Sequence, residues 1–337
     1  MAHESGRSTT VLAHITDAHV APSGRRTAVL KDLSVPILED LIDQIRANGA
    51  HATLFGGDNI DNQGDGEGEL DAFVALAEKS GRFLCTVGNH EAVNVQRGGG
   101  RISKEVFAER LAGHGIRGPD ELNFSEIVGN VRVIGIDTTL TGTHGGYVTP
   151  RTMSFLAKEI RDAEEDHIVV LGHHLLAAPW APYRLDAWNQ EYLVANRDAV
   201  TSLLASSSRV RAYLCGHHHA SRIQRIAGRG DSSGFYHILT PSPSAYPHGA
   251  RLIRLEADAM IVETLRPRIS GILEMGREAV LGGRKAQRFR TLGSERSFTD
   301  YVFGRASDND AILPYDAPMR TLRPSDDRRT TDAVSPT

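Results

Sequence analysis

The chain lacks several features that mark particular classes of protein. Its 337 residues include two cysteines, Cys85 and Cys215, which cannot build the disulfide framework of a small secreted domain. Lys and Arg number 38 against 42 Asp and Glu, so no overall positive field attracts nucleic acid or an anionic membrane. No apolar run is long enough to span a bilayer, and the polar first ten residues lack the apolar core of a signal peptide. These absences favour a cytoplasmic protein without a membrane span.

Histidine, by contrast, is abundant. The chain has 15 histidines, and seven of them fall in four short clusters: His19, His90, His173 with His174, and His217 to His219. Neutral imidazole is a common ligand of transition metals. A hydrophobic content of 40% supplies enough apolar surface for a sizeable core around such a site. The composition therefore predicts a globular protein with a metal site.

Short apolar runs alternate with amphipathic segments along the first 265 residues, which is typical of an α/β fold. Thr149 followed by Pro150 is a helix-start signal, and Gly49 and Gly81 each follow a helical pattern. The expected helices cover residues 34–48, 69–79, 103–111, 149–164 and 191–205. The expected strands cover residues 11–15, 53–55, 83–87, 131–136, 168–171, 212–215, 235–239, 251–255 and 260–265.

Five of these strands run directly into polar residues that can bind a metal. In open α/β sheets, ligands collect at the carboxyl ends of the strands, so five such ends can converge on one rim. Each fragment alone is a weak signal, but three consecutive histidines after an apolar strand are hard to accommodate in a core, because each buried imidazole needs a partner. The five fragments are Asp17-Ala18-His19, Gly56-Gly57-Asp58-Asn59, Gly88-Asn89-His90-Glu91, Gly172-His173-His174 and Gly216-His217-His218-His219.

Taken together and in this order, the five fragments resemble the blocks of the calcineurin-like metallophosphoesterase superfamily. The resemblance runs from about Val11 to Leu265. The Gly-His-x-His ending of the last fragment is most similar to the class III cyclic-nucleotide phosphodiesterase group. The superfamily fold implied by this resemblance is a four-layer α/β/β/α sandwich of two mixed sheets.

The resemblance implies a site with two transition-metal ions. Asp58 would bridge them, and His90 would contact the substrate phosphate and assist the leaving oxygen. The first metal would be bound by Asp17, His19, Asp58 and His219, and the second by Asp58, Asn89, His173 and His217. Mixed oxygen and nitrogen ligation suits Mn, Fe or Zn. A metal-bridging hydroxide would then attack phosphorus in line.

At two places the sequence departs from the patterns of subgroups within this superfamily. Purple acid phosphatases carry a tyrosine ligand three residues after the bridging Asp, where this chain has Asp61, so no tyrosinate colour is expected. Protein Ser/Thr phosphatases carry phosphate-binding arginines next to these blocks, where this chain has Asn62 and Val87-Gly88. Both departures point away from those two groups.

Several neighbouring residues are candidates for supporting roles. His174 is expected to orient a ligand, Glu91 to support the His90 loop, and His218 to face solvent or substrate. His248, on a late loop, is a candidate substrate contact. Between His174 and residue 191, four side chains could either contact the substrate or fix their loop to the protein body: Trp180, Tyr183, Arg184 and Trp188.

The character of the chain changes after Leu265. Residues 266–296 carry a net charge of +5, and the last fifteen residues are polar. We therefore expect a catalytic domain over 1–265, a C-terminal appendage over 266–322 that caps the site or forms a dimer contact, and a disordered tail over 323–337. Dimers are common among the relatives, so a homodimer is an expectation from the family alone.

The first functional hypothesis is a dinuclear metal-dependent phosphodiesterase acting on a small substrate, with a 3′,5′-cyclic nucleotide as the default. The alternative is a phosphatase acting on a small phosphorylated metabolite. A nuclease would need a long basic groove, which the acidic balance of residues outside the appendage argues against. A non-catalytic scaffold should have lost metal ligands, and this chain retains all of them.

Overall fold

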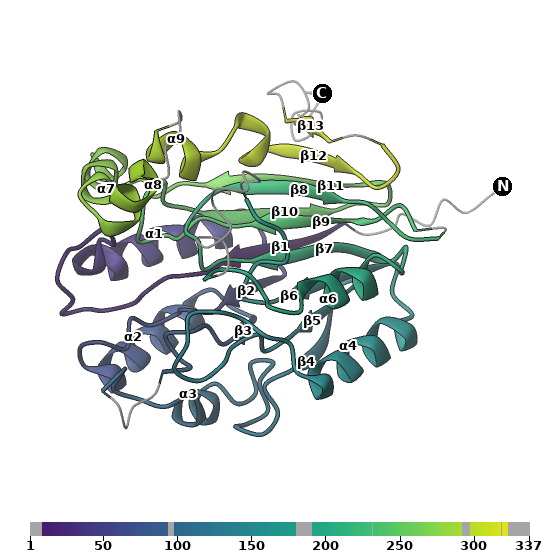
Figure 1. Ribbon diagram of the computed structural model, residues 1–337, viewed down its shortest axis with the longest axis horizontal. Helices are drawn as coiled ribbons and strands as arrows, with labels where there is room; N and C mark the ends of the chain where they lie inside the picture. The colour runs from purple at the N-terminus through teal and green to yellow at the C-terminus, as the bar shows by residue number, and fades with distance from the viewer. Residues whose placement is uncertain are drawn as a thin grey trace, which may run out of the picture.

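The computed structural model describes residues 9–93, 98–179, 191–230, 232–291, 297–317 and 319–322. Two mixed β-sheets lie face to face at the centre (Figure 1). The seven-stranded sheet has the order β13-β12-β11-β10-β1-β2-β3, and the six-stranded sheet has the order β4-β5-β6-β7-β9-β8. None of the helices in the described ranges combines the length and the apolar character needed to cross a bilayer.

In the seven-stranded sheet, the parallel part carries the first three predicted strand ends. The strands β1 (Thr10–Ile15), β2 (Ala52–Gly56) and β3 (Phe83–Thr86) run parallel, so their carboxyl ends share one edge. The remaining strands of this sheet pair antiparallel and are β10 (Ala250–Leu255), β11 (Ala259–Leu265), β12 (Ala311–Pro314) and β13 (Arg320–Thr321).

The six-stranded sheet carries the other two predicted strand ends. Its parallel strands are β5 (Val131–Gly135), β6 (His167–Leu171), β7 (Val210–Cys215) and β9 (Phe235–Leu239). Its edges are the antiparallel strands β4 (Phe124–Val128) and β8 (Arg222–Ile226). The ends of β6 and β7 therefore lie next to each other on this sheet.

The inner faces of the two sheets share one apolar layer. Side chains alternate along a strand, so in β1 Leu12 points toward the other sheet while Ala13 and Ile15 point toward the helices. Leu12, Leu171 and Leu214, from both sheets, belong to the same buried cluster. This layer holds the strand ends of the two sheets at a fixed separation.

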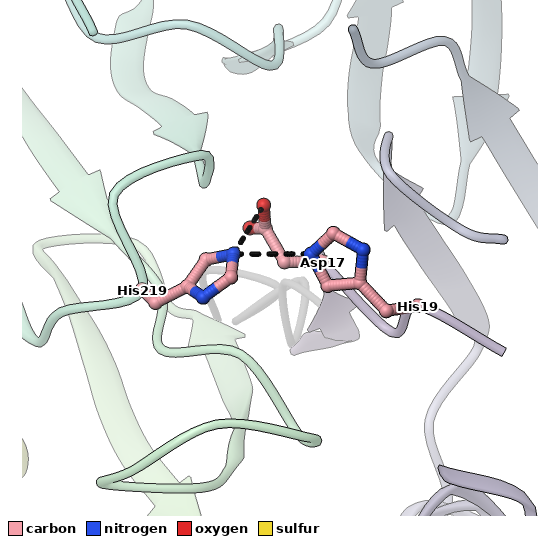
Figure 2. A group of neighbouring side chains, drawn as sticks. All are labelled: Asp17, His19 and His219. Atoms are coloured by element: carbon pink, nitrogen blue, oxygen red, sulfur yellow. Dashed lines mark hydrogen bonds and ion pairs between the residues drawn. The ribbon is translucent and has the colours of Figure 1, made fainter. Parts of the chain in front are cut away.

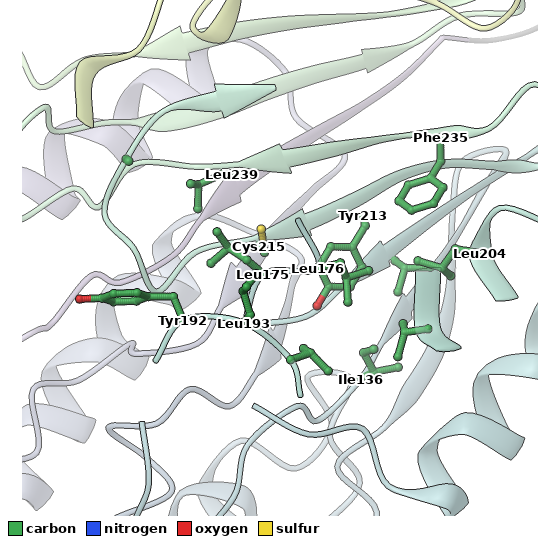
Figure 3. Packing of buried hydrophobic residues seen from close by; sticks show 14 of the residues in the cluster. Ile136, Leu175, Leu176, Tyr192, Leu193, Leu204, Tyr213, Cys215, Phe235 and Leu239 are labelled. Atoms are coloured by element: carbon green, nitrogen blue, oxygen red, sulfur yellow. The ribbon is translucent and has the colours of Figure 1, made fainter. Parts of the chain in front are cut away.

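Helices cover both outer faces and complete the predicted α/β/β/α sandwich, which is confirmed. On the seven-stranded sheet lie α1 (Ser34–Ala47), α2 (Gly66–Lys79) and α3 (Lys104–Arg110). The other sheet is covered by α4 (Pro150–Asp162) and α6 (Arg197–Leu204), and Figure 3 shows Leu204 packed near Tyr213 of β7. Helix α1 buries Ile37, Leu41 and Ile45 at helical spacing, as its pattern predicts.

The described parts of the segment after Leu265, residues 266–291, 297–317 and 319–322, are built into this fold. Strand β12 pairs with β11 and extends the seven-stranded sheet. Three helices precede it and pack on one another at one end of the sheets (Figure 1): α7 (Ile272–Leu281), α8 (Arg284–Thr291) and α9 (Phe298–Phe303). Ile272 joins the core beneath α1, whereas Phe289 and Tyr301 join the core of the six-stranded sheet. The division at Leu265 and the disordered tail stay predictions, and the tail lies outside the described residues.

Two predictions of secondary structure were wrong in part. The helix expected over residues 191–205 begins only at Arg197, because Leu193 pairs with Leu175 in a short parallel bridge and Leu175 donates a hydrogen bond to the Tyr192 carbonyl at 3.1 Å. The sequence analysis also missed the edge strands β4 and β8. Both mix polar with apolar residues, and only sheet pairing makes them regular.

Candidate metal centre

The five polar fragments meet where the carboxyl ends of β1, β2, β3, β6 and β7 come together. Among the described residues, potential metal-binding atoms form three groups there, and within each group the atoms lie within 4.8 Å of one another. The groups are Asp17 with His19 and His219, Asp58 with His173 and His217, and His19 with Asp61 and His90. All predicted ligands except Asn89 belong to one of these groups, and the Asn89 Oδ1 atom lies 3.1 Å from His173 Nε2.

The first group joins the end of β1 to the end of β7. Figure 2 shows the two imidazoles of His19 and His219 pointing toward each other, with the Asp17 carboxylate between and above them in this view. Their Nε2 atoms are 3.1 Å apart, and His219 Nε2 lies 3.3 Å from Asp17 Oδ1. The backbone N–H of His217 donates to both Asp17 oxygens, at 3.0 and 2.8 Å. The carboxylate is therefore held in place from the chain segment that carries His219.

The second group is oriented by carbonyl oxygens that fix which imidazole nitrogen faces the centre. His173 Nδ1 lies 2.9 Å from the Gly56 carbonyl, and its Nε2 lies 3.4 Å from Asp58 Oδ2. His217 Nε2 lies 3.1 Å from the Glu191 carbonyl. A ring nitrogen next to a carbonyl must carry the proton, so His173 Nε2 and His217 Nδ1 are left as ligand atoms.

His90 stands at the border of the two groups. Its backbone N–H donates to Asp58 Oδ1 at 2.8 Å, and its Nδ1 lies 2.7 Å from the Asp61 carbonyl. The Nε2 atom is thereby turned toward Asp58, 4.0 Å from Oδ2. The His90 side chain is 24% exposed, whereas those of His173 and Asp58 are at most 3% exposed. His90 is therefore accessible to a ligand.

Asp61 is a component that the sequence analysis did not place in the site. One of its carboxylate oxygens lies 2.7 Å from Lys31 Nζ. The other lies 3.8 Å from His19 Nδ1 and 3.9 Å from His90 Nδ1. The sequence signals were its place three positions after Asp58, where purple acid phosphatases carry a tyrosine ligand, and its acidic side chain. Lys31 gave no signal, because it approaches from the short 3-10 helix Lys31–Leu33.

The backbone of these fragments is strained. Asp17, His19, Asp58, His217 and His219 all have φ between 45° and 67°, a region that side chains with a Cβ rarely occupy. Such a conformation costs on the order of 1–3 kcal/mol for each residue and persists only where the surroundings impose it. All five are predicted metal ligands, and Asn62 and His248 are the other two non-glycine residues in this region among the described residues, so most of the strain coincides with the predicted site.

Glu91 holds the Asp58 turn in this conformation. Its fully buried carboxylate accepts hydrogen bonds from the N–H groups of Asp58, Asn59, Ile60 and Gly88, at 2.7 to 3.2 Å. One carboxylate thus joins the loop after β2 to the loop after β3, consistent with the supporting role expected from the sequence.

Glycine is required at two of these turns. A Cβ at Gly88 would overlap the carboxylate and the backbone nitrogen of Asp58, and a Cβ at Gly216 would overlap Thr16 and the Asp17 carboxylate. The glycines before the Asn-His-Glu and His-His-His fragments therefore let the chain pass close to the acidic residues.

Electrostatics keep the carboxylates charged and three imidazoles neutral. Burial alone would raise the pKa of Asp17, but the neighbouring His219 lowers it to about 2, and His173 likewise holds the pKa of Asp58 well below its usual range. Burial lowers the pKa of His19, His217 and His219. Burial alone would lower the pKa of His173, but the Asp58 charge raises it to about 9. Ionised carboxylates and neutral imidazoles are the forms that bind metal ions, so a cation bound at the second group would displace the His173 proton.

The residues present fit a pair of transition-metal ions. His19 Nδ1 and Asp61 Oδ1 are buried without a hydrogen-bond partner among the described residues. Two neutral imidazoles whose Nε2 atoms face each other at 3.1 Å, next to a carboxylate, form a donor set that a cation would satisfy. The mixture of nitrogen and oxygen donors suits Mn, Fe or Zn better than an all-oxygen calcium site.

The three other histidines predicted to support the site or contact substrate differ in how close they lie to the metal-binding groups. Both ring nitrogens of His174 are occupied, by Thr138 Oγ1 at 2.8 Å and the His144 carbonyl at 3.0 Å, so it braces the site from outside. His218 does not face solvent, because it is 2% exposed and its Nε2 lies 2.7 Å from the Tyr301 hydroxyl. It lines a cavity together with His219, so the alternative that it faces substrate stays a prediction. His248 is fully buried against Gly276 of α7 and the Pro243 carbonyl, and is not brought to the site.

The predictions for the loop before residue 191 lie outside the described residues. They concern Trp180, Tyr183, Arg184 and Trp188.

In the part of the chain that the structure describes, a central cavity is lined by residues of the metal-binding groups and two further cavities adjoin it. The central cavity, of about 340 Å³, is lined by His19, Asp58, His90, His217 and His219 among others. The α7 cavity, of about 660 Å³, shares Thr27, Val29, His219 and Lys285 with it. The His144 cavity, of about 500 Å³, shares His90 and His144 with it. Lys285 and His144 were missed in the sequence because nothing local links them to the metal-binding fragments.

Comparisons with known proteins agree with this geometry. The family model described as calcineurin-like phosphoesterase matches residues 10–221. The chain is 30% identical over 225 residues to a Rhodococcus erythropolis protein named "Probable cyclic nucleotide phosphodiesterase", covering 64% of this chain and 67% of that protein. It is 26% identical over 238 residues to a "cAMP/cGMP dual specificity phosphodiesterase" of Mycobacterium tuberculosis, covering 67% of each.

A solved structure shows the same fold. The crystal structure of a dimetal phosphatase from Danio rerio aligns with a TM-score of 0.59 and 19% identity, covering 77% of this chain and 96% of that chain.

Proposed function

The chain belongs to the calcineurin-like phosphoesterase family of metal-dependent phosphoric ester hydrolases, and from that premise we propose that it hydrolyses a small phosphodiester, with a 3′,5′-cyclic nucleotide as the default substrate. The observation that carries the proposal is the convergence of the complete metal-binding set between two side cavities. The two relatives named as cyclic nucleotide phosphodiesterases support the same substrate class.

We assign the metal-binding roles by position. Asp17, His19 and His219 would hold the first ion and Asn89, His173 and His217 the second, with Asp58 between them. Two such cations, when bound, would lower the pKa of a water molecule and neutralise charge on the phosphate. Mn, Fe and Zn all suit this donor set.

The protein's own groups orient the metal-binding side chains and provide a proton donor for the leaving oxygen. The Gly56 and Glu191 carbonyls fix the tautomers of His173 and His217, and Glu91 fixes the Asp58 loop. His90 is anchored at Nδ1 by the Asp61 carbonyl, so its Nε2 is the atom that faces the central cavity. At that position, Nε2 can pass a proton to the leaving oxygen of a phosphate ester.

The shape of the site favours a diester. A phosphodiester carries two organic groups, and in-line displacement places the attacking and leaving oxygens on opposite sides of phosphorus. The central cavity adjoins the α7 cavity at His219 and the His144 cavity at His90. Two compartments can therefore receive the two separate groups of an open-chain diester, whereas a monoester would use one. In a 3′,5′-cyclic nucleotide both ester oxygens belong to one ribose, so support for that default substrate comes from the two relatives rather than from the cavities.

The test is hydrolysis by protein that is stripped of metal with a chelator and reloaded with Mn. Bis(p-nitrophenyl) phosphate and p-nitrophenyl phosphate form a matched diester and monoester pair, and cyclic AMP is assayed beside them. Activity that returns with Mn and favours the diester and cyclic AMP supports the proposal. A preference for the monoester would instead identify a phosphatase, and bound metal without turnover on any of the three would indicate a scaffold.

A further inference from the structure

The α7 cavity adjoins the central cavity, with which it shares His219 and Lys285, and it is built largely from the segment after Leu265. Helices α7, α8 and α9 line it on one side and residues 27–29 on another. Its volume of about 660 Å³ lies within the range of sites that bind small organic ligands. His219, a predicted metal ligand, lies in the wall between this cavity and the central one. A ligand whose phosphate lies at the metal centre can thus extend into the α7 cavity.

The lining of this cavity is mainly apolar. It includes Val29, Ala245, Ala279, Val280, Phe298 and Val302. The charged lining residues Glu278 and Arg284 belong to the exposed parts of α7 and α8. An apolar compartment beside a metal centre gives an apolar or aromatic group a large favourable binding free energy. A second charged group would gain little there, because burying its charge is costly.

Lys285 marks the boundary between the two cavities. It is half-buried at the start of α8, lines both cavities, and its Nζ lies 5.1 Å from the centre of the Tyr192 ring. Within the described residues, no carboxylate forms an ion pair with it, although its neighbour Arg288 pairs with Glu191 at 2.8 Å. An ammonium group without an acidic partner at the mouth of an anion site is suited to bind a phosphate oxygen.

We propose that the α7 cavity binds an apolar or aromatic ester group of the substrate and that Lys285 contacts its phosphate. The C-terminal helices then decide which phosphoesters the enzyme accepts. The inference rests on the proposed function to the extent that it takes a phosphoester as ligand. A nucleobase is one group that the cavity would accept.

Binding of non-hydrolysable probes tests this independently of turnover. The Mn-reloaded protein is titrated calorimetrically with inorganic phosphate, methylphosphonate and phenylphosphonate. The wild-type protein should bind phenylphosphonate at least tenfold more tightly than methylphosphonate, because a phenyl ring fills apolar space that a methyl group leaves empty. Equal affinities for the two phosphonates would refute the assignment of the cavity.

Two variants separate the two parts of the proposal. Ala279→Phe fills the cavity from α7 and should abolish the preference for phenylphosphonate while changing phosphate affinity less than about twofold. Lys285→Gln should weaken the binding of all three anions about tenfold and leave the preference for phenylphosphonate over methylphosphonate intact. Ala199→Phe, on the exposed face of α6, and Lys158→Gln, on the exposed face of α4, are the matched controls. Metal content and circular dichroism establish that each variant is folded, and Ala279→Leu replaces Ala279→Phe if the latter is not.

Failure of this inference and failure of the proposed function give different results. Unchanged phosphate affinity in Lys285→Gln, or an unchanged phenyl preference in the Ala279 variants, would overturn the inference even if the enzyme hydrolyses diesters. The predicted changes in binding, found in a protein that cleaves none of the ester substrates, would support the inference and refute the proposed function.

Discussion

Replacing Glu91 by glutamine should destabilise the protein more than any surface substitution of the same kind. The Glu91 carboxylate is fully buried and accepts four backbone hydrogen bonds, two at Oε1 and two at Oε2. Glutamine keeps one oxygen and replaces the other by an amide N–H₂ group. Two backbone N–H groups, either those of Asn59 and Ile60 or those of Asp58 and Gly88, then face another donor.

The expected loss in the free energy of unfolding follows from the number of backbone N–H donors left without an acceptor. A buried donor left without an acceptor costs about 1–3 kcal/mol, so two of them cost on the order of 4 kcal/mol. That is a large fraction of the total of about 5–15 kcal/mol that is typical of folded proteins. Because the lost bonds hold the Asp58 loop, Glu91→Gln should also bind Mn at least tenfold more weakly.

The assay is urea unfolding followed by circular dichroism, with metal removed and at pH 8.5. Burial and the nearby Asp58 charge raise the pKa of Glu91 to about 7, so the carboxylate is ionised at that pH. Glu109→Gln, at an exposed position of α3, is the matched control and should change the free energy of unfolding by less than about 0.5 kcal/mol. A loss below about 1 kcal/mol for Glu91→Gln would refute the argument that this carboxylate holds the two loops together. If Glu91→Gln does not fold, Glu91→Asp, which keeps the charge, should fold and be intermediate.

Three further predictions concern the site, the core and acid stability. Asp58→Ala should lose both metal and activity, whereas His90→Ala should keep metal, measured by elemental analysis, and lose at least a hundredfold in kcat; a metal-free His90→Ala protein would contradict this division of roles. Phe73→Ala should lower the free energy of unfolding by about 3–5 kcal/mol, because its fully buried ring packs edge-on against Phe55 at 5.0 Å, whereas Leu140→Ala at a 40% exposed position should have little effect; equal losses would contradict the packing argument. Burial lowers the pKa of His237 from 6.5 to about 3, so the folded state disfavours its protonation, and the stability it contributes is present above pH 6.5 and is lost as the pH falls toward 3. Between pH 7 and 5 the wild-type protein should lose about 2 kcal/mol more than His237→Gln in urea unfolding, and parallel pH profiles would show that this imidazole does not carry the effect.

The local sequence was sufficient for the layered fold and for most of the residues at the site. An apolar strand that runs directly into metal-binding residue types is a contiguous signal, and each of the five fragments carries it without reference to any other part of the chain. In four of the five fragments a glycine precedes these residues. Helix α1 is similar, because the spacing of Ile37, Leu41 and Ile45 already defines its buried face. The family resemblance then joined the fragments into one site, which the fold places at adjoining strand ends.

Errors arose where the conformation depends on distant partners. Leu193 is extended because it pairs with Leu175, although its own segment has a helical pattern. His218 is buried because Tyr301, 83 residues later, supplies a hydroxyl for its ring. Strands β4 and β8 lie at sheet edges, where polar residues are tolerated and the alternation that marks a strand is weak.

The sequence by itself determined the ligand chemistry, the strand and helix pattern and therefore the family, because all of these depend on residues close together in the chain. The tertiary structure alone decided what surrounds the metal centre. It brought Lys31 to Asp61, His144 to Asn89 at 3.4 Å, and Lys285 to the wall shared by two cavities. These contacts join segments that no local pattern relates, and they form only when the two sheets close on their common apolar layer and the C-terminal helices pack across their end.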